Sequence, residues 1–208
     1  VLQSVSLKIF TGDVLHLKGR TGSGKSTLLQ TLLGETYPTR KIYTKGNLDV
    51  AYVSQTAWIR NATLKENILF FRPFDKDAYQ MALHVADLTK DLEQLEDGDQ
   101  TEIGEKGLTL SGGQKMRVAV ARAVYGSTTL LVKLYLFDDI FAALDGGTAL
   151  RVARRLLRFV ANSDSVLFFA GNLCGSVLKR ARATTSSTDE LFKSRSGSPS
   201  GTTKTSYS

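Results

Sequence analysis

Cysteine, proline and long apolar runs are scarce or missing in this chain of 208 residues. The single cysteine, Cys174, excludes an internal disulfide framework and is typical of a reducing compartment such as the cytosol. No apolar run approaches the roughly 20 residues that a membrane helix needs, so we expect that the chain itself does not cross a bilayer. Residues 1–10 resemble a strand more than a signal peptide, and no methionine begins the chain; we expect a segment of a longer protein.

Charge is unevenly distributed along the chain. The net charge is +7, and much of the excess lies after residue 150. Such a basic region could face an anionic surface, or it could be an ordinary solvated face, and the second interpretation is favoured. The hydrophobic content of 42% is ordinary for a globular protein, and the length suffices for one sizeable core with a small subdomain.

A glycine-rich loop at residues 19–27 fits the phosphate-binding pattern Gly-x4-Gly-Lys-Ser/Thr. Gly22 and Gly24 can adopt backbone angles closed to other residues, which lets backbone N–H groups surround a phosphate. Lys25 would reach the β- and γ-phosphates, and the Ser26 hydroxyl would ligate magnesium. The loop therefore predicts nucleotide binding.

The segments around this loop provide the expected context. Val14 to Leu17 predicts a short buried strand before it, and the leucines at helical spacing after it predict a helix ending at Gly34. The phosphates would then lie at a helix N-terminus, where unpaired N–H groups and the helix dipole favour negative charge.

Four further motifs follow in order. A buried strand over residues 48–54 leads to Gln55, and the run Thr-Ala-Trp-Ile-Arg-Asn-Ala-Thr-Leu-Lys-Glu-Asn-Ile-Leu-Phe occupies residues 56–70. Apolar residues at helical spacing span 75–95, and Leu-Ser-Gly-Gly-Gln at 110–114 precedes a helix expected over 114–125. The strand Leu-Tyr-Leu-Phe-Asp ends at Asp138, and Ala-Ala-Leu-Asp occupies 142–145.

These motifs closely resemble those of the ATP-binding cassette family, and most of all the first cassette of the multidrug-resistance-associated, or C, subfamily. The resemblance covers roughly residues 1–173. It implies an α/β fold of the phosphate-loop NTPase class, with a mostly parallel core sheet, an antiparallel strand region and a helical subdomain carrying the signature. We expect the cassette to span 1–183, with its helical subdomain at about 72–125. Residues 184–208 are rich in Ser, Thr and Gly, which predicts a disordered tail or linker.

The resemblance also assigns roles to residues. ATP would be bound by the phosphate loop, and the signature would complete the site of a second cassette; these residues are Gly19, Thr21, Gly22, Ser23, Gly24, Lys25, Ser26, Thr27, Ser111, Gly112, Gly113 and Gln114. Magnesium would be held by Ser26, Gln55 and Asp138, while Asp139 and Gln55 would act on the attacking water.

Three features depart from the family pattern. The residue after Asp138 is Asp139, one methylene shorter than the usual catalytic Glu, and a misplacement of about 1 Å can cost roughly 10²-fold in rate. Gly171 occupies the position of the switch histidine unless a one-residue register shift brings in Asn172. About four extra residues lie near 130–133. We expect this site to turn over slowly, and restoring both groups with Asp139→Glu and Gly171→His to raise turnover.

The sequence thus predicts the ATP-binding cassette of an exporter of organic anions, conjugates or drugs. It would act as a transport ATPase at the cytoplasmic face of a membrane, paired with a second cassette and attached to transmembrane domains. One alternative is a nucleotide-sensing module that gates a channel or receptor. A soluble cassette acting on nucleic acid is disfavoured by the segment 58–70, and a decayed copy stays open because the C-terminal region diverges.

Overall fold

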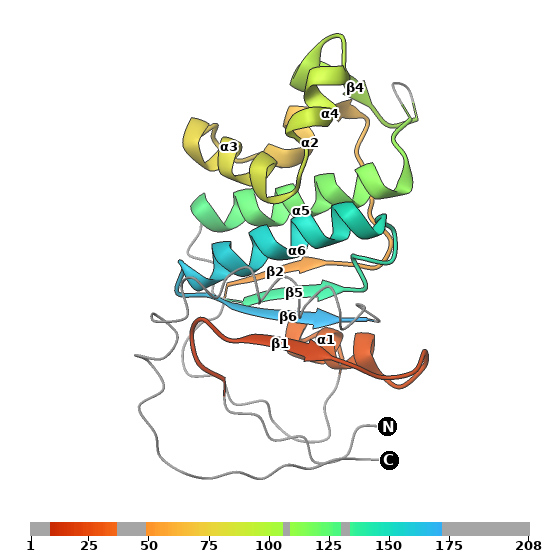
Figure 1. Ribbon diagram of the computed structural model, residues 1–208, viewed down its shortest axis with the longest axis vertical. Helices are drawn as coiled ribbons and strands as arrows, with labels where there is room; N and C mark the ends of the chain where they lie inside the picture. Colours follow the sequence, from red (N-terminus) through yellow and green to blue (C-terminus); the bar gives the residue numbers. More distant parts are fainter. Residues whose placement is uncertain (1–8, 37–48, 106–108, 130–133, 172–208) are drawn as a thin grey trace.

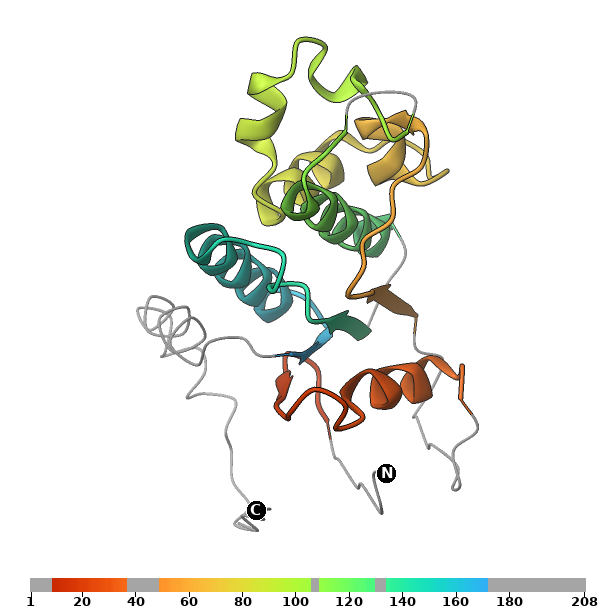
Figure 2. The ribbon, with the colours of Figure 1, turned by 90° about the vertical axis from the view of Figure 1, so that its right-hand side faces the viewer.

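The computed structural model of the chain describes residues 9–36, 49–105, 109–129 and 134–171 (Figures 1 and 2). Asn172, the extra residues near 130–133 and the tail from 184 lie outside this part. So do residues 1–8 of the expected first strand, and Ile9 and Phe10 are not in a strand. The elements are, in order, β1 (Val14–Leu17), α1 (Lys25–Leu33), β2 (Val50–Val53), β3 (Ala62–Thr63), α2 (Leu64–Leu69), α3 (Lys76–Val85), α4 (Thr89–Gln94), η1 (Gly98–Gln100), β4 (Glu102–Ile103), α5 (Gly112–Thr129), β5 (Leu134–Asp138), α6 (Gly146–Ala161) and β6 (Val166–Ala170).

Within the described residues, the main sheet contains four strands in the order β1-β6-β5-β2, and every neighbouring pair is parallel. Strand β6 lies between the strand that precedes the phosphate loop and the strand that ends at Asp138. In its register, Ala170 pairs with Leu17 on one side and with Asp138 on the other. The strands expected at 14–17, 48–54 and 134–138 are therefore confirmed, the second with shorter bounds, but only the strand at 134–138 is fully buried; β1 is half-buried along its length, and in β2 only Val53 is buried.

Helices cover both faces of this sheet because the strand side chains alternate. Tyr135 and Phe137 of β5 pack with α5 and α6, whereas Leu134 and Leu136 pack on the other face with Leu29 of α1. Strand β5 is buried along its whole length, as expected of a central parallel strand. The result is a three-layer α/β arrangement, visible in Figure 2.

The helical subdomain, α2 to α4, packs on α5 at the end of the molecule away from β1 (Figure 1). Its apolar pattern over 75–95 predicted continuous helical spacing, but the structure divides it into α3 and α4. The break occurs at Asp87, whose φ of 58° is left-handed and cannot continue a helix. The strands β3 and β4 form an antiparallel pair beside α2.

Helix α5 is the longest helix of the described residues and connects the subdomain to the sheet. It extends over Gly112–Thr129, longer at both ends than the helix expected over 114–125. It contacts α2 and α3 on one side and β2 on the other. Among the described residues, no helix is both long enough and apolar enough to span a bilayer.

Candidate functional site

The carboxyl ends of the parallel strands bring the expected nucleotide residues to one edge of the sheet. The phosphate loop follows β1, Gln55 follows β2, Asp138 ends β5 and Gly171 follows β6. Because these strands are neighbours and parallel, their carboxyl ends point the same way, and loops at this edge form ligand sites in open α/β sheets.

The phosphate loop has the backbone that its glycines predict. Gly22 and Gly24 have φ values of 79° and 89°, in the left-handed region that a residue with a side chain rarely adopts. At Gly19 the constraint is space, because a Cβ there would lie 2.4 Å from Oγ of Ser23. Residues Thr21 to Ser23 of the loop are exposed.

Lys25 and Ser26 begin α1 directly after the loop. The ammonium group of Lys25 donates to the carbonyl oxygens of Gly19 (2.8 Å) and Arg20 (3.0 Å), which holds it over the loop. The Ser26 side chain is exposed. A glycine-rich loop, a lysine held over it and the exposed Ser26 hydroxyl form a donor set that fits a magnesium-bound nucleotide.

The two acidic residues of β5 and its following turn differ in environment. Asp138 is 5% exposed, and its charge contributes, after burial, to raising the pKa of Tyr52 on β2. Asp139 has a left-handed φ of 49°, and its backbone N–H donates to Ala170 O at 2.7 Å. Nε2 of Gln55 lies 3.4 Å from Oδ2 of Asp139, a long contact that nevertheless brings these two residues together.

Gly171 faces Asp139 so closely that no side chain fits between them. A Cβ on Gly171 would lie 2.3 Å from Oδ1 of Asp139 and 3.0 Å from its Cα, and the φ of Gly171 is +133°. A histidine at this position would therefore require the backbone to shift. The carboxylate of Asp139 occupies the space that the expected switch side chain would need.

Sequence reasoning did not anticipate the contact that fixes Gly171. Nε2 of His16 on β1 lies 2.9 Å from the carbonyl oxygen of Gly171. The backbone N–H of Gly171 donates to Leu17 O at 3.3 Å, which continues the β1–β6 pairing by one residue. A histidine within an apolar strand was the available signal, but its partner comes from 155 positions away in the sequence.

The signature residues lie on a different part of the molecule from the phosphate loop. Ser111 and Gln114 cap α5 reciprocally: the Ser111 N–H donates to Gln114 Oε1 (3.0 Å), and the Gln114 N–H donates to Ser111 Oγ (3.2 Å). A Cβ on Gly113 would approach Ala143 O to 3.0 Å, so this glycine allows the signature to contact the 142–145 loop closely. The Ser-x-x-Gln spacing alone could have predicted this cap.

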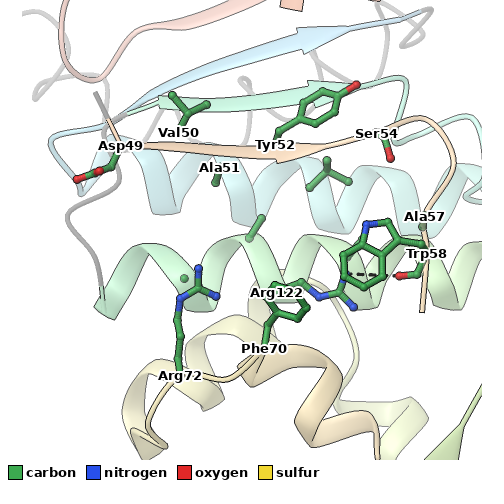
Figure 3. Close-up of a pocket in the computed structure, with 14 residues that line it drawn as sticks. Asp49, Val50, Ala51, Tyr52, Ser54, Ala57, Trp58, Phe70, Arg72 and Arg122 are labelled. Atoms are coloured by element: carbon green, nitrogen blue, oxygen red, sulfur yellow. Dashed lines mark hydrogen bonds between the residues drawn. The ribbon is translucent and has the colours of Figure 1, made fainter. Parts of the chain in front are cut away.

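A separate cavity of about 410 Å³ lies between β2, α5 and the segment that follows Gln55 (Figure 3). Arg122 of α5 is 9% exposed and donates to Asn67 O, Asn67 Oδ1 and Trp58 O. Its guanidinium lies 4.1 Å from the Trp58 ring centroid, a favourable cation–π distance. Burial, and then the charges of Arg60 and Arg72, lower the pKa of Arg122 to about 10. Arg122 thus connects the segment after Gln55 to the signature helix.

Comparison with known proteins bears on these motifs directly. The chain matches the ABC transporter family over residues 2–140. It is 45% identical to multidrug resistance protein mrp-7 of Caenorhabditis elegans over 167 residues. It is 42% identical, also over 167 residues, both to ABC transporter C family member 8 of Dictyostelium discoideum and to human ATP-binding cassette sub-family C member 3. Each alignment covers 80% of this chain, which spans only 10% of each relative.

The family match includes the phosphate loop, Gln55, the signature and Asp138, and the relatives with these identities are C family transporters. The α/β fold and the arrangement of these motifs at the sheet edge and the start of α5 agree with that match. The chain belongs to the ABC transporter family as an ATP-binding cassette resembling those of the C subfamily.

Proposed function

We propose that this chain is the first nucleotide-binding domain of an ATP-driven exporter, with its own site binding MgATP and turning it over slowly. The phosphate loop and Lys25 would bind the phosphates, and Ser26, Gln55 and Asp138 would hold magnesium. Bound magnesium neutralises charge that develops on the phosphates during hydrolysis. Ser111 to Gln114 would complete the nucleotide site of a second cassette, and attached transmembrane domains would carry organic anions, conjugates or drugs.

The close approach of Gly171 to Asp139 is the observation that supports slow turnover. Position 171 has no side chain to contact a γ-phosphate, and Asp139 fills the space where one would lie. Asp139 itself is one methylene shorter than Glu and lies near the Gln55 amide. These features leave the binding residues in place and weaken those that would act on water.

Equilibrium binding of MgATP to this chain tests the proposal first. We expect saturable binding that Lys25→Ala abolishes, because the substitution removes the ammonium group held over the loop. Lys18→Ala is the matched control, since Lys18 is exposed and precedes the loop. No binding by a folded wild-type chain would contradict the proposed function. Binding with equal loss in both variants would indicate a general charge effect.

The same geometry also favours a second candidate function, a nucleotide-sensing module that gates an attached channel or receptor. A site that binds ATP without an effective group at position 171 suits a sensor as well as a slow ATPase. Measuring ATP consumption and transport together in the parent protein separates the two. Transport coupled to ATP consumption supports the exporter, whereas ATP-dependent gating without consumption supports the sensor.

A further inference from the structure

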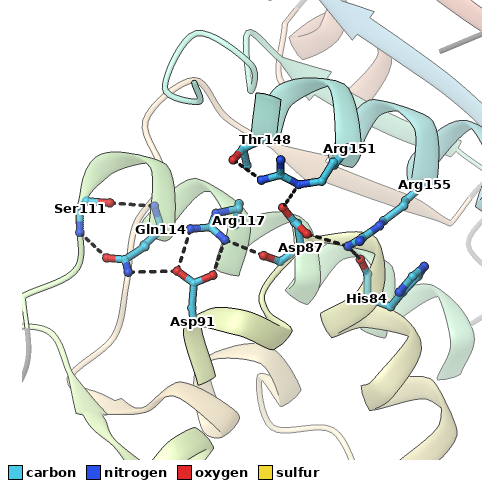
Figure 4. A network of polar contacts seen from close by, with 9 residues as sticks. All are labelled: His84, Asp87, Asp91, Ser111, Gln114, Arg117, Thr148, Arg151 and Arg155. Atoms are coloured by element: carbon cyan, nitrogen blue, oxygen red, sulfur yellow. Dashed lines mark hydrogen bonds and ion pairs between the residues drawn. The ribbon is translucent and has the colours of Figure 1, made fainter. Parts of the chain in front are cut away.

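A network of polar side chains connects the signature to α4, to the α3–α4 corner and to α6 (Figure 4). At its start, the side chain of Gln114 caps α5 through Oε1, which accepts from the Ser111 N–H at 3.0 Å. The other end of the same amide, Nε2, donates to Oδ1 of Asp91 at 3.1 Å. Because both the oxygen and the nitrogen of the amide are hydrogen-bonded, the Gln114 side chain has a fixed orientation and holds the backbone of Ser111 in place.

Asp91 receives a second and stronger partner in Arg117, one turn further along α5. Nη2 of Arg117 donates to Oδ1 of Asp91 at 2.8 Å, and Nη1 pairs with Oδ2. The two side chains are only 14% and 15% exposed, so water screens this bidentate pair weakly. The pair fixes the carboxylate in the position that the Gln114 amide requires.

The network continues from Arg117 to α6 through Asp87. Nη1 of Arg117 also donates to the carbonyl oxygen of Asp87, the left-handed residue between α3 and α4. The Asp87 carboxylate in turn accepts from Arg151 (2.7 Å) and Arg155 (2.9 Å) of α6. Helix α6 begins at Gly146, directly after its cap residue Asp145, which ends the 142–145 loop beside Gly113.

We propose that Asp91 is a positioning residue: through Gln114 it sets the geometry of the signature that covers the nucleotide of the partner cassette. This inference rests on the proposed function, in which the signature acts across the interface between two cassettes. Asp87 extends the same support to α6, so the signature and the 142–145 loop form one connected surface. Asp91 does not touch the nucleotide in this arrangement and acts only through Gln114 and Arg117.

Nucleotide trapping at the partner cassette of the parent transporter tests this role, with MgATP as the probe. Asp91→Asn places an amide N–H₂ where one carboxylate oxygen accepted, which opposes the donors of Arg117 and Gln114. We expect about a tenfold loss of trapping, the effect of one charge-assisted hydrogen bond. MgATP binding at this chain's own phosphate loop should change less than about twofold. Glu93→Gln is the matched control, an exposed acid on the same helix.

Arg117→Lys is a second variant, to be used if Asp91→Asn does not fold. It retains the positive charge at position 117. A lysine cannot hold both carboxylate oxygens, so Asp91 can rotate away from Gln114, and trapping should fall in the same direction. Thermal unfolding of each variant separates positioning from stability. Normal trapping by a folded Asp91→Asn transporter, or an equal loss in Glu93→Gln, would overturn the inference.

Gly112→Asp distinguishes failure of this inference from failure of the proposed function. A Cβ at Gly112 meets nothing within 4 Å, so the substitution leaves the cassette's own packing intact while it adds negative charge to the signature surface. The proposed function predicts that this variant loses trapping. If Gly112→Asp traps nucleotide normally, the proposed pairing of this chain with a second cassette is wrong. If Gly112→Asp loses trapping and folded Asp91→Asn does not, the proposed function stands and only the inferred positioning role of Asp91 is wrong.

Discussion

The contact between Gly171 and Asp139 predicts that position 171 does not accept a side chain without cost. Alanine is the smallest perturbation, since it adds one methyl group. That methyl would lie 2.3 Å from Asp139 Oδ1 and 3.0 Å from Asp139 Cα, well inside van der Waals contact. The φ of +133° at this position adds backbone strain for any residue other than glycine.

These two contributions set the expected magnitude. Backbone strain of this kind costs about 1–3 kcal/mol, and overpacking by one methyl group costs about 1–3 kcal/mol. Gly171→Ala should therefore lower the free energy of unfolding by about 2–6 kcal/mol. Asp139→Ala removes the carboxylate, so adding Gly171→Ala in that background should cost about 1–3 kcal/mol less. Gly171→His should lower the free energy of unfolding by at least as much as Gly171→Ala.

Denaturant unfolding of the wild type, both single variants and the double variant measures this coupling directly. Gly126→Ala is not a suitable control, because its Cβ would approach the Arg72 guanidinium. Gly112→Ala is suitable, because its Cβ enters open space. The steric argument is wrong if Gly171→Ala is as stable as Gly112→Ala. It is also wrong if the effects of Gly171→Ala and Asp139→Ala on the free energy of unfolding simply add in the double variant. The same steric conflict bears on the double replacement Asp139→Glu with Gly171→His. It can raise turnover only if the backbone at position 171 shifts to admit the histidine.

Three further predictions follow from individual side chains. Asp139→Glu with Gly171 retained should raise ATP turnover in the assembled transporter, because it extends the carboxylate by one methylene; unchanged turnover would contradict its assignment as the base. Asn67→Ala should lower the free energy of unfolding by about 2–4 kcal/mol, since it removes side-chain hydrogen bonds to the part-buried backbone of Arg60 and Thr63 and to the guanidinium of Arg122. A denaturant titration checks this; Asn61 is exposed but is not a suitable control, because its side chain accepts from the Glu105 N–H. Burial, and then Arg155, lower the pKa of His84, so the unfolded chain takes up this proton first as pH falls. Stability should therefore decrease as pH falls through the ordinary histidine pKa of 6.5, and His84→Gln should remove that part of the decrease.

The sequence by itself determined the family, the order of the motifs and most of the core strands. The phosphate loop and the signature are contiguous stretches, so both can be recognised from the residue types at adjacent positions in the sequence. The strands at 14–17 and 134–138 were predictable because a strand inside a parallel sheet appears as a short apolar run, although only the second is fully buried. The cap between Ser111 and Gln114 was also within reach, since it depends on a spacing of three residues.

Only the tertiary structure decided how remote residues share space. Asp139 and Gly171 compete for one position because β5 and β6 are neighbours in a particular register. Asp91 meets Gln114 and Arg117 because the chain breaks between α3 and α4 at Asp87, a break that the helical spacing of apolar residues over 75–95 did not indicate. Such contacts follow from packing between segments far apart in the chain, for which a single sequence carries no periodic signal.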